Sequence, residues 1–90
     1  MTNTRFLRHP DLRLTSLEGE GVVLHLKERK YFSVNETGLL ILEALKEPRT
    51  FDDLVAEVLR EYEVSPEMAA ETAKAFLDHC LSAAVVEQVA

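Results

Sequence analysis

Histidine and cysteine are the residue types in this sequence most able to do chemistry. His79 and Cys80 are adjacent in a segment with helical periodicity, so their side chains diverge by about 100° and cannot easily share a metal ion. His9 and His25 lie far apart in the sequence and lack the spacing of metal ligands. Cys80 falls in an apolar helical stripe, where thiols are usually inert. These residues therefore predict neither a metal site nor a nucleophile.

Close pairs of acidic residues are the other candidates for catalysis. Asp52 and Asp53 stand at the start of a predicted helix, where they favour the positive end of its dipole. Glu61 and Glu63 stand at its exposed end and are accounted for by solubility. The sequence has no glycine-rich phosphate loop and no Ser/His/Asp motif. We therefore expect a protein that is not an enzyme and that has no cofactor.

Length and charge further restrict the class of protein. Ninety residues with 47% hydrophobic content predict one domain over 1–90, with an ordered core over about 12–87. Of the net charge of −6, the segment 1–30 carries six basic and four acidic residues, whereas 31–90 carries four basic and twelve acidic residues. The second segment would repel nucleic acid.

The sequence also indicates a location. No apolar run approaches the roughly 20 residues of a membrane-spanning helix. Residues 1–13 lack the apolar region of a secretory signal, and residues 1–10 are expected to be frayed or loosely docked. The single cysteine fits a reducing compartment, so we expect a cytoplasmic protein.

Apolar patterning predicts the elements that position any site. Three short strands are expected over 12–17, 22–26 and 31–34, as an antiparallel meander. Segment 18–21 contains two glycines free to take positive φ in the first turn, and the charged segment 27–30 forms the second.

Three helices are expected to follow the strands. The first begins at Asn35 and is apolar nearly all round, which predicts deep burial before Pro48 stops it. The second begins at Thr50 and the third at Ser65, which is followed by proline and an acid. Segment 85–89 would be a final strand or a capping extension. Strands segregated from helices predict an α+β fold, with a three-stranded antiparallel sheet followed by a three-helix bundle.

The junction of the third strand and the first helix is the feature that most clearly indicates a function. Strand 31–34 runs directly into the helix, with Asn35 as its N-cap. If this strand lies at a sheet edge, its unpaired N–H and C=O groups can capture an extended peptide as one more strand. This interpretation makes the protein a peptide-binding module.

Five segments together carry a resemblance to a known family. They are Gly21–Leu24, Tyr31–Gly38, Ile41–Leu45, Thr50–Val55 and Ala75–Leu77, and the resemblance covers roughly residues 12–87. In these segments the chain resembles the PqqD-like family, a group of small winged-helix-like domains called RiPP recognition elements. RiPPs are ribosomally made, enzymatically modified peptides. The chain departs from the family at Cys80, where leucine is common, and near Ala83 and Ala84, where glycine is frequent; these changes bear on packing and on the position of the last segment.

The resemblance implies a function. Such domains bind the leader segment of a precursor peptide as a strand along the third strand, in the cleft with the third helix. They present the precursor to a leader peptidase or another modifying enzyme, in lasso-type and related pathways. A free-standing chain of this size resembles the discrete members.

Ten residues follow as candidates for peptide binding. On the third strand and the turn before it they are Arg29, Lys30, Tyr31, Phe32, Ser33 and Val34, and on the third helix Lys74, Leu77, Asp78 and Leu81. Leu77 and Leu81 would line the base of an apolar pocket, and Lys74 would pair with an acidic residue of the leader. The sequence leaves open whether Tyr31 and Ser33 or the alternate pair face the groove.

Alternatives from other classes remain at this stage. The chain could be a subunit that only docks on and stabilises a partner enzyme. A winged-helix DNA-binding regulator shares the fold, but its helices would need basic residues against phosphates, and these helices are acidic. A free edge strand could also pair with a second copy, so the protein would be a monomer or a weak dimer.

Overall fold

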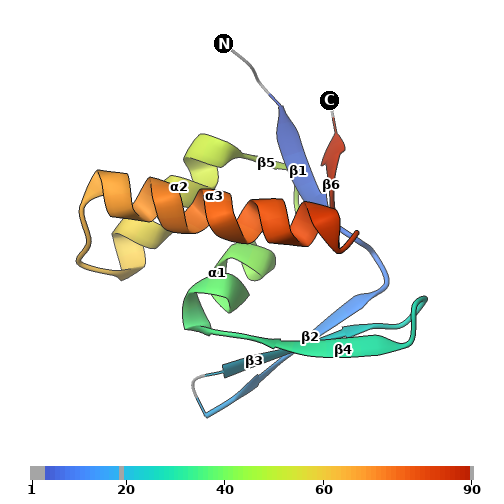
Figure 1. Ribbon diagram of the computed structural model, residues 1–90. Coiled ribbons are helices and arrows are strands. Elements are labelled where there is room, and N and C mark those ends of the chain that lie inside the picture. The colour runs from blue at the N-terminus through green and yellow to red at the C-terminus, as the bar shows by residue number, and fades with distance from the viewer. Residues whose placement is uncertain (1–3, 19, 90) are drawn as a thin grey trace.

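The computed structural model describes residues 4–18 and 20–89 of the chain (Figure 1). Within them the chain forms six strands and three helices. In order these are β1 (Arg5–Arg8), β2 (Leu12–Leu17), β3 (Glu20–His25), β4 (Lys30–Val34), α1 (Glu36–Ala44), β5 (Arg49–Thr50), α2 (Phe51–Glu61), α3 (Pro66–Ser82) and β6 (Val86–Val89). The α+β class is therefore confirmed, with the predicted meander followed by the predicted helices.

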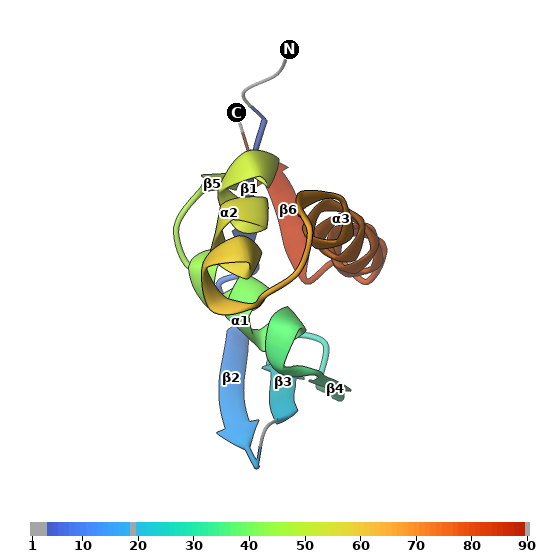
Figure 2. The ribbon, with the colours of Figure 1, turned by 90° about the vertical axis from the view of Figure 1, so that its left-hand side faces the viewer.

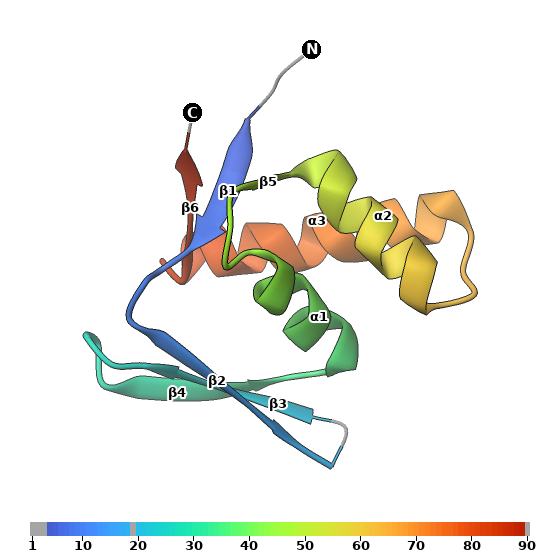
Figure 3. The ribbon, with the colours of Figure 1, turned by 180° about the vertical axis from the view of Figure 1, so that it is seen from behind.

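The strands form two separate antiparallel sheets. The predicted meander is the sheet of order β2-β3-β4, with Leu24 opposite Tyr31 across β3 and β4. The second sheet has the order β5-β1-β6. Figures 1 and 3 show the meander at one end of the molecule, with α1 packed directly above it and the second sheet beyond the helices.

The second sheet corrects the prediction for the N-terminal segment. Residues 1–3 lie outside the described residues, but Arg5–Arg8 is the central strand of this sheet rather than a frayed end. Phe6 is only 8% exposed and joins the core, and the Arg8 N–H donates to Leu45 O at 3.0 Å. Local patterning did not predict this strand, because its main partner, β6, lies at the other end of the chain. Of the two alternatives left open for 85–89, a final strand or a capping extension, the structure has the strand, β6.

The turn between β2 and β3 also differs in part from the prediction. Gly19 lies outside the described residues, and Glu18 adopts a positive φ of 46°. Gly21 lies within β3, opposite Val34, rather than in the turn. A Cβ on Gly21 would lie 2.8 Å from Val34 Cγ2 and 2.9 Å from Leu39 Cδ1. Glycine is therefore required here for the close approach of α1 to the sheet.

Helix α1 is the centre of the core. The Asn35 carboxamide oxygen accepts from the Gly38 N–H at 2.8 Å, which caps the helix directly after β4. Ile41, Leu42 and Leu45 are fully buried. The deep burial predicted from the apolar pattern is therefore confirmed, and it fixes the helix against the meander.

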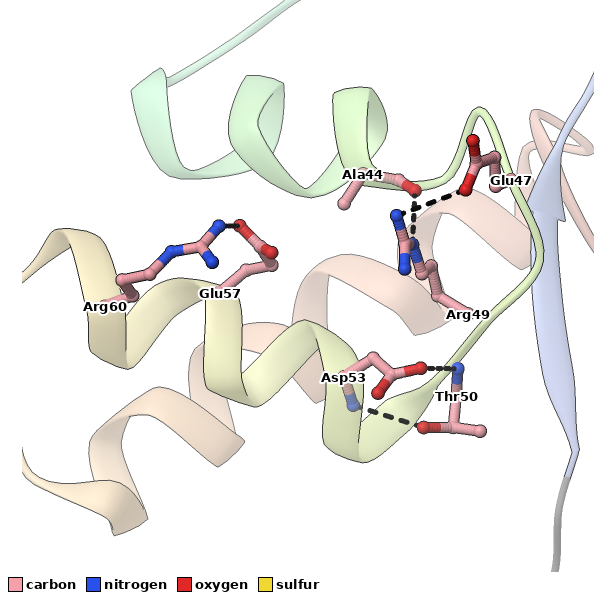
Figure 4. A network of polar contacts seen from close by, with 7 residues as sticks. All are labelled: Ala44, Glu47, Arg49, Thr50, Asp53, Glu57 and Arg60. Atoms are coloured by element: carbon pink, nitrogen blue, oxygen red, sulfur yellow. Dashed lines mark hydrogen bonds and ion pairs between the residues drawn. The ribbon is translucent and has the colours of Figure 1, made fainter.

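Helix α2 begins with a capping box (Figure 4). The Thr50 hydroxyl accepts from the Asp53 N–H at 3.1 Å, and the Asp53 carboxylate accepts from the Thr50 N–H at 3.0 Å. This second hydrogen bond lowers the pKa of Asp53 below its ordinary value. The Arg49 Nε donates to Ala44 O at 3.2 Å, which ties the link before α2 to the end of α1.

Candidate functional site

Strand β4 is one edge of the meander. Among the described residues it pairs with β3 alone, from Gly21 opposite Val34 to His25 opposite Lys30. The other edge of β4 therefore carries unpaired backbone N–H and C=O groups. Figure 2 shows α3 on this side of the molecule and β2 on the opposite side. Such an edge can accept an extended segment as a fourth strand.

The alternation of side chains along β4 settles which pair faces the helices. Val34 is buried and Phe32 packs against the core, so this pair faces the helices. Tyr31 is 76% exposed and Ser33 is also exposed, so this pair faces solvent on the outer side of the sheet. The sequence left the choice open because each pair contains an aromatic residue, which either packs in a core or lines a groove.

Helix α3 runs alongside β4 in the opposite direction. Near one end, a Cβ on Gly38 would lie 2.7 Å from the Phe76 ring and 3.1 Å from Val34 Cβ, so Phe76 is next to the end of β4. At the other end, the residues that follow the helix share a pocket with Lys30 and Phe32. Residues 30–34 of a strand span about 13 Å. Residues 76–83 of a helix span about 10 Å, so the two segments have similar lengths along the edge of the sheet.

A pocket of about 380 Å³ opens at the start of β4. It is lined by His25, Glu28, Lys30, Phe32, Ser82, Ala83, Ala84 and Val85. Phe32 and Val85 provide apolar surface, while Glu28 and Lys30 bring opposite charges to the rim. Ala84 adopts a positive φ of 61° directly after α3, which turns the chain from the helix into β6. We call the free edge of β4 together with this pocket the β4–α3 groove.

His25 and His9 form a pair that the sequence did not reveal. Their rings lie 4.6 Å apart between centroids, at the junction of the two sheets. His25 is 3% exposed, and its Nδ1 accepts from the Glu28 N–H at 3.3 Å. His9 Nδ1 likewise accepts from the Asp11 N–H at 3.1 Å. Each ring thus holds a turn, and His25 also lines the pocket. The contact between the two rings was not evident from the sequence because it depends on tertiary packing.

The four predicted residues of α3 lie elsewhere. Lys74, Leu77, Asp78 and Leu81 line a separate pocket of about 350 Å³ with Phe6, Phe51 and Gln88. That pocket faces β1 and β6, and β4 does not line it. The structure therefore does not combine the two predicted groups in one cleft. The residues beside β4 are instead Phe76 and Ser82 of α3, together with Ala83 and Ala84 directly after the helix.

The individual predicted contacts change accordingly. Lys74 Nζ is 3.1 Å from Asp78 Oδ2, so its charge already has a partner, although an exposed pair of this kind contributes little stability. Leu77 is 5% exposed and belongs to the core, so replacing it with a charged residue would test folding rather than binding. Arg29 is exposed in the turn before β4, with a positive φ of 57°. The binding role of these residues stays a prediction.

Cys80 is buried in the core. Desolvation raises the pKa of its thiol to about 12, so the nucleophilic thiolate is scarcely populated near neutral pH. In the ranges 4–18 and 20–89, no three His, Cys, Asp or Glu side chains come together as a metal site would require.

The fold and the groove define a class: a winged-helix-like α+β domain with an open sheet edge beside a helix. The chain belongs to the family described as coenzyme PQQ synthesis protein D (PqqD), whose pattern matches residues 20–86. The resemblance inferred from the sequence is therefore confirmed. No curated protein matches the chain significantly.

Two solved structures share the fold. One, "TbiB1 in Complex with the TbiA(beta) Leader Peptide", has a TM-score of 0.78 at 23% identity, over 93% of this chain and 98% of that chain. The other, "Lasso peptide synthetase B1 complexed with the leader peptide", has a TM-score of 0.74 at 21% identity, over 91% of this chain and 96% of that chain.

In the described residues, no helix is long and apolar enough to cross a membrane.

Proposed function

We propose that this protein is a RiPP recognition element that binds the leader segment of a ribosomally made precursor peptide. The observation that carries the proposal is the free edge of β4 beside α3, in a chain of the PqqD family. The two solved structures of the same fold contain leader peptides, which supports the same class of ligand here.

The leader would pair with β4 as a fourth strand. Main-chain hydrogen bonds would provide affinity without reading sequence. Side chains of the added strand alternate, so half would lie beside Phe32 and Val34 under α3 and half beside Tyr31 and Ser33 on the outer face. The pocket lined by His25 and Ala83 would select the residue that enters it. Arg29 and Lys30 would meet acidic groups at the strand entrance.

Binding would serve delivery rather than catalysis. We propose that the domain brings the precursor to a leader peptidase or another modifying enzyme in the cytoplasm, and that the domain itself is not an enzyme. Low reactivity of the buried Cys80 thiol supports a non-catalytic role. The competing role, in which the domain only docks on and stabilises an enzyme, requires no leader in the β4–α3 groove. A weak dimer through the same edge would compete with the leader.

Fluorescence anisotropy with a labelled leader from the precursor encoded beside the gene tests the proposal. A scrambled leader is the control for sequence. Ala83→Arg would place a long charged side chain in the pocket and should weaken binding by at least about tenfold, or about 1.4 kcal/mol. Ala56→Arg is the matched control, because Ala56 is an exposed alanine on α2 that does not line the pocket.

The results separate the alternatives. Selective, saturable binding that Ala83→Arg weakens and Ala56→Arg leaves unchanged would support the groove. Binding that both variants preserve would move the leader to another surface. No binding at about 100 μM would favour the enzyme-docking role.

A further inference from the structure

A second groove lies at the other edge of the meander. It is a pocket of about 480 Å³ between β2 and the end of α1, lined by Arg8, Leu12, Arg13, Leu14, Glu43 and Lys46. β2 pairs with β3 alone among the described residues, so its outer edge also carries unpaired backbone groups. Figure 2 shows β2 on the side of the sheet away from α3. We call this surface the β2 groove.

The β2 groove is basic on a chain that is acidic. Three cationic side chains, those of Arg8, Arg13 and Lys46, face one carboxylate, that of Glu43, whereas the whole chain carries a net charge of −6. Over residues 4–18 and 20–89, none of these four takes part in an ion pair. The positive charge of the groove is therefore not neutralised within the domain.

Two of the cations are held at the groove by backbone contacts. Arg8 Nη1 donates to Leu42 O at 3.0 Å, near the end of α1, and the rest of its guanidinium has no partner in the hydrogen bonds of the described chain. Arg13 Nη1 lies 3.4 Å from Leu12 O, on its own strand. Buried Leu12 and half-buried Leu14 provide an apolar floor between the charges.

We propose that the β2 groove binds an extended acidic segment of a partner protein. The open edge of β2 would pair with the backbone of that segment, and its carboxylates would meet Arg13, Lys46 and the free part of Arg8. Charge complementarity identifies the partner's chemistry, because a neutral or basic segment would leave the cations unpaired. The site is on the opposite edge from β4, so it does not require that the leader bind.

The probe is an eight-residue capped peptide of alternating Glu and Thr, titrated into the ¹⁵N-labelled chain and followed by NMR. A peptide of alternating Lys and Thr is the control. Saturable shifts are expected at the amides of Arg13, Leu14 and Lys46 with the acidic peptide only. They should weaken between 50 and 300 mM salt, since exposed charges are screened.

The variant Arg13→Glu/Lys46→Glu should weaken the acidic peptide at least about tenfold. Lys27→Glu/Arg60→Glu is the matched control, because it changes the net charge equally at exposed positions outside the groove. Lys46→Glu alone serves if the first double variant loses its thermal transition. No shifts, shifts confined to β4, or equal loss in both double variants would overturn the proposal. Leader binding, measured separately at β4, would be unaffected by this result.

Discussion

Gly38→Ala tests the packing of α3 against β4 directly, because that packing determines how the substitution affects stability. Alanine is better than glycine in a helix by about 1 kcal/mol, which favours the variant. However, the new Cβ would lie 2.7 Å from Phe76 Cε1 and 3.1 Å from Val34 Cβ. Overpacking of this kind costs about 1–3 kcal/mol. We expect a net loss of stability of about 1 kcal/mol.

The loss is measurable by thermal denaturation. For a domain of this size, 1 kcal/mol corresponds to a fall in melting temperature of about 4–8 °C. Because the backbone of α1 is fixed by the core, relief must come from movement of the Phe76 ring. The shift should therefore reach the β4–α3 groove and appear as changed amide signals at Val34 and along α3.

Phe76→Leu provides the control. Leucine removes the ring atoms that the new Cβ would meet, so Gly38→Ala should be less destabilising in the Phe76→Leu background than alone. The two changes should couple by at least about 0.5 kcal/mol. If Gly38→Ala instead raises the melting temperature, as at an exposed helical glycine, the argument that Gly38 sets the spacing of α3 and β4 is refuted.

Four other predictions concern the caps and the core. Thr50→Ala should cost about 1 kcal/mol by chemical denaturation, because it removes the cap of α2; stabilities that agree within error would contradict this role. The pKa of Asp53 is lowered in the folded state, so its stabilising contribution is present above the ordinary aspartate pKa and is lost as pH falls through the lowered value; Asp53→Asn should therefore destabilise at pH 7 and approach wild type in acid. Ile41→Ala should cost about 2–5 kcal/mol, since Ile41 is fully buried, and a loss below 1 kcal/mol would show that the core collapses around it. Cys80 should react with a thiol reagent only after unfolding, because burial raises its pKa to about 12; rapid labelling of the native protein would be inconsistent with this burial.

The sequence predicted the elements that depend on residues close together in the chain. Asn35, Thr50 and Ser65 each cap a helix as predicted, since a cap depends on residues within one turn. The meander was likewise predictable, because its strands are neighbours in sequence and are separated by short turns.

Long-range packing explains what the sequence did not predict. The stripe containing Leu77 and Leu81 is apolar, but periodicity cannot say whether it faces β4 or β1. The position of Phe76 beside Val34 likewise depends on the absence of a side chain at Gly38, which periodicity does not reveal. The structure therefore places the predicted β4 residues on a free sheet edge and the predicted α3 residues at a separate pocket, and the peptide-binding site itself stays a prediction.

The pairing of β1 with β6 has a consequence for the order of folding. Arg5 lies opposite Val89, so this sheet closes a loop that contains nearly the whole chain. Closing it costs about 2–3 kcal/mol more in chain entropy than closing the β3–β4 hairpin. The meander contains mainly local contacts and is expected to form early, both in refolding and as the chain leaves the ribosome. The edge of β4 would then be formed before β6 pairs with β1, the strand that contains Phe6.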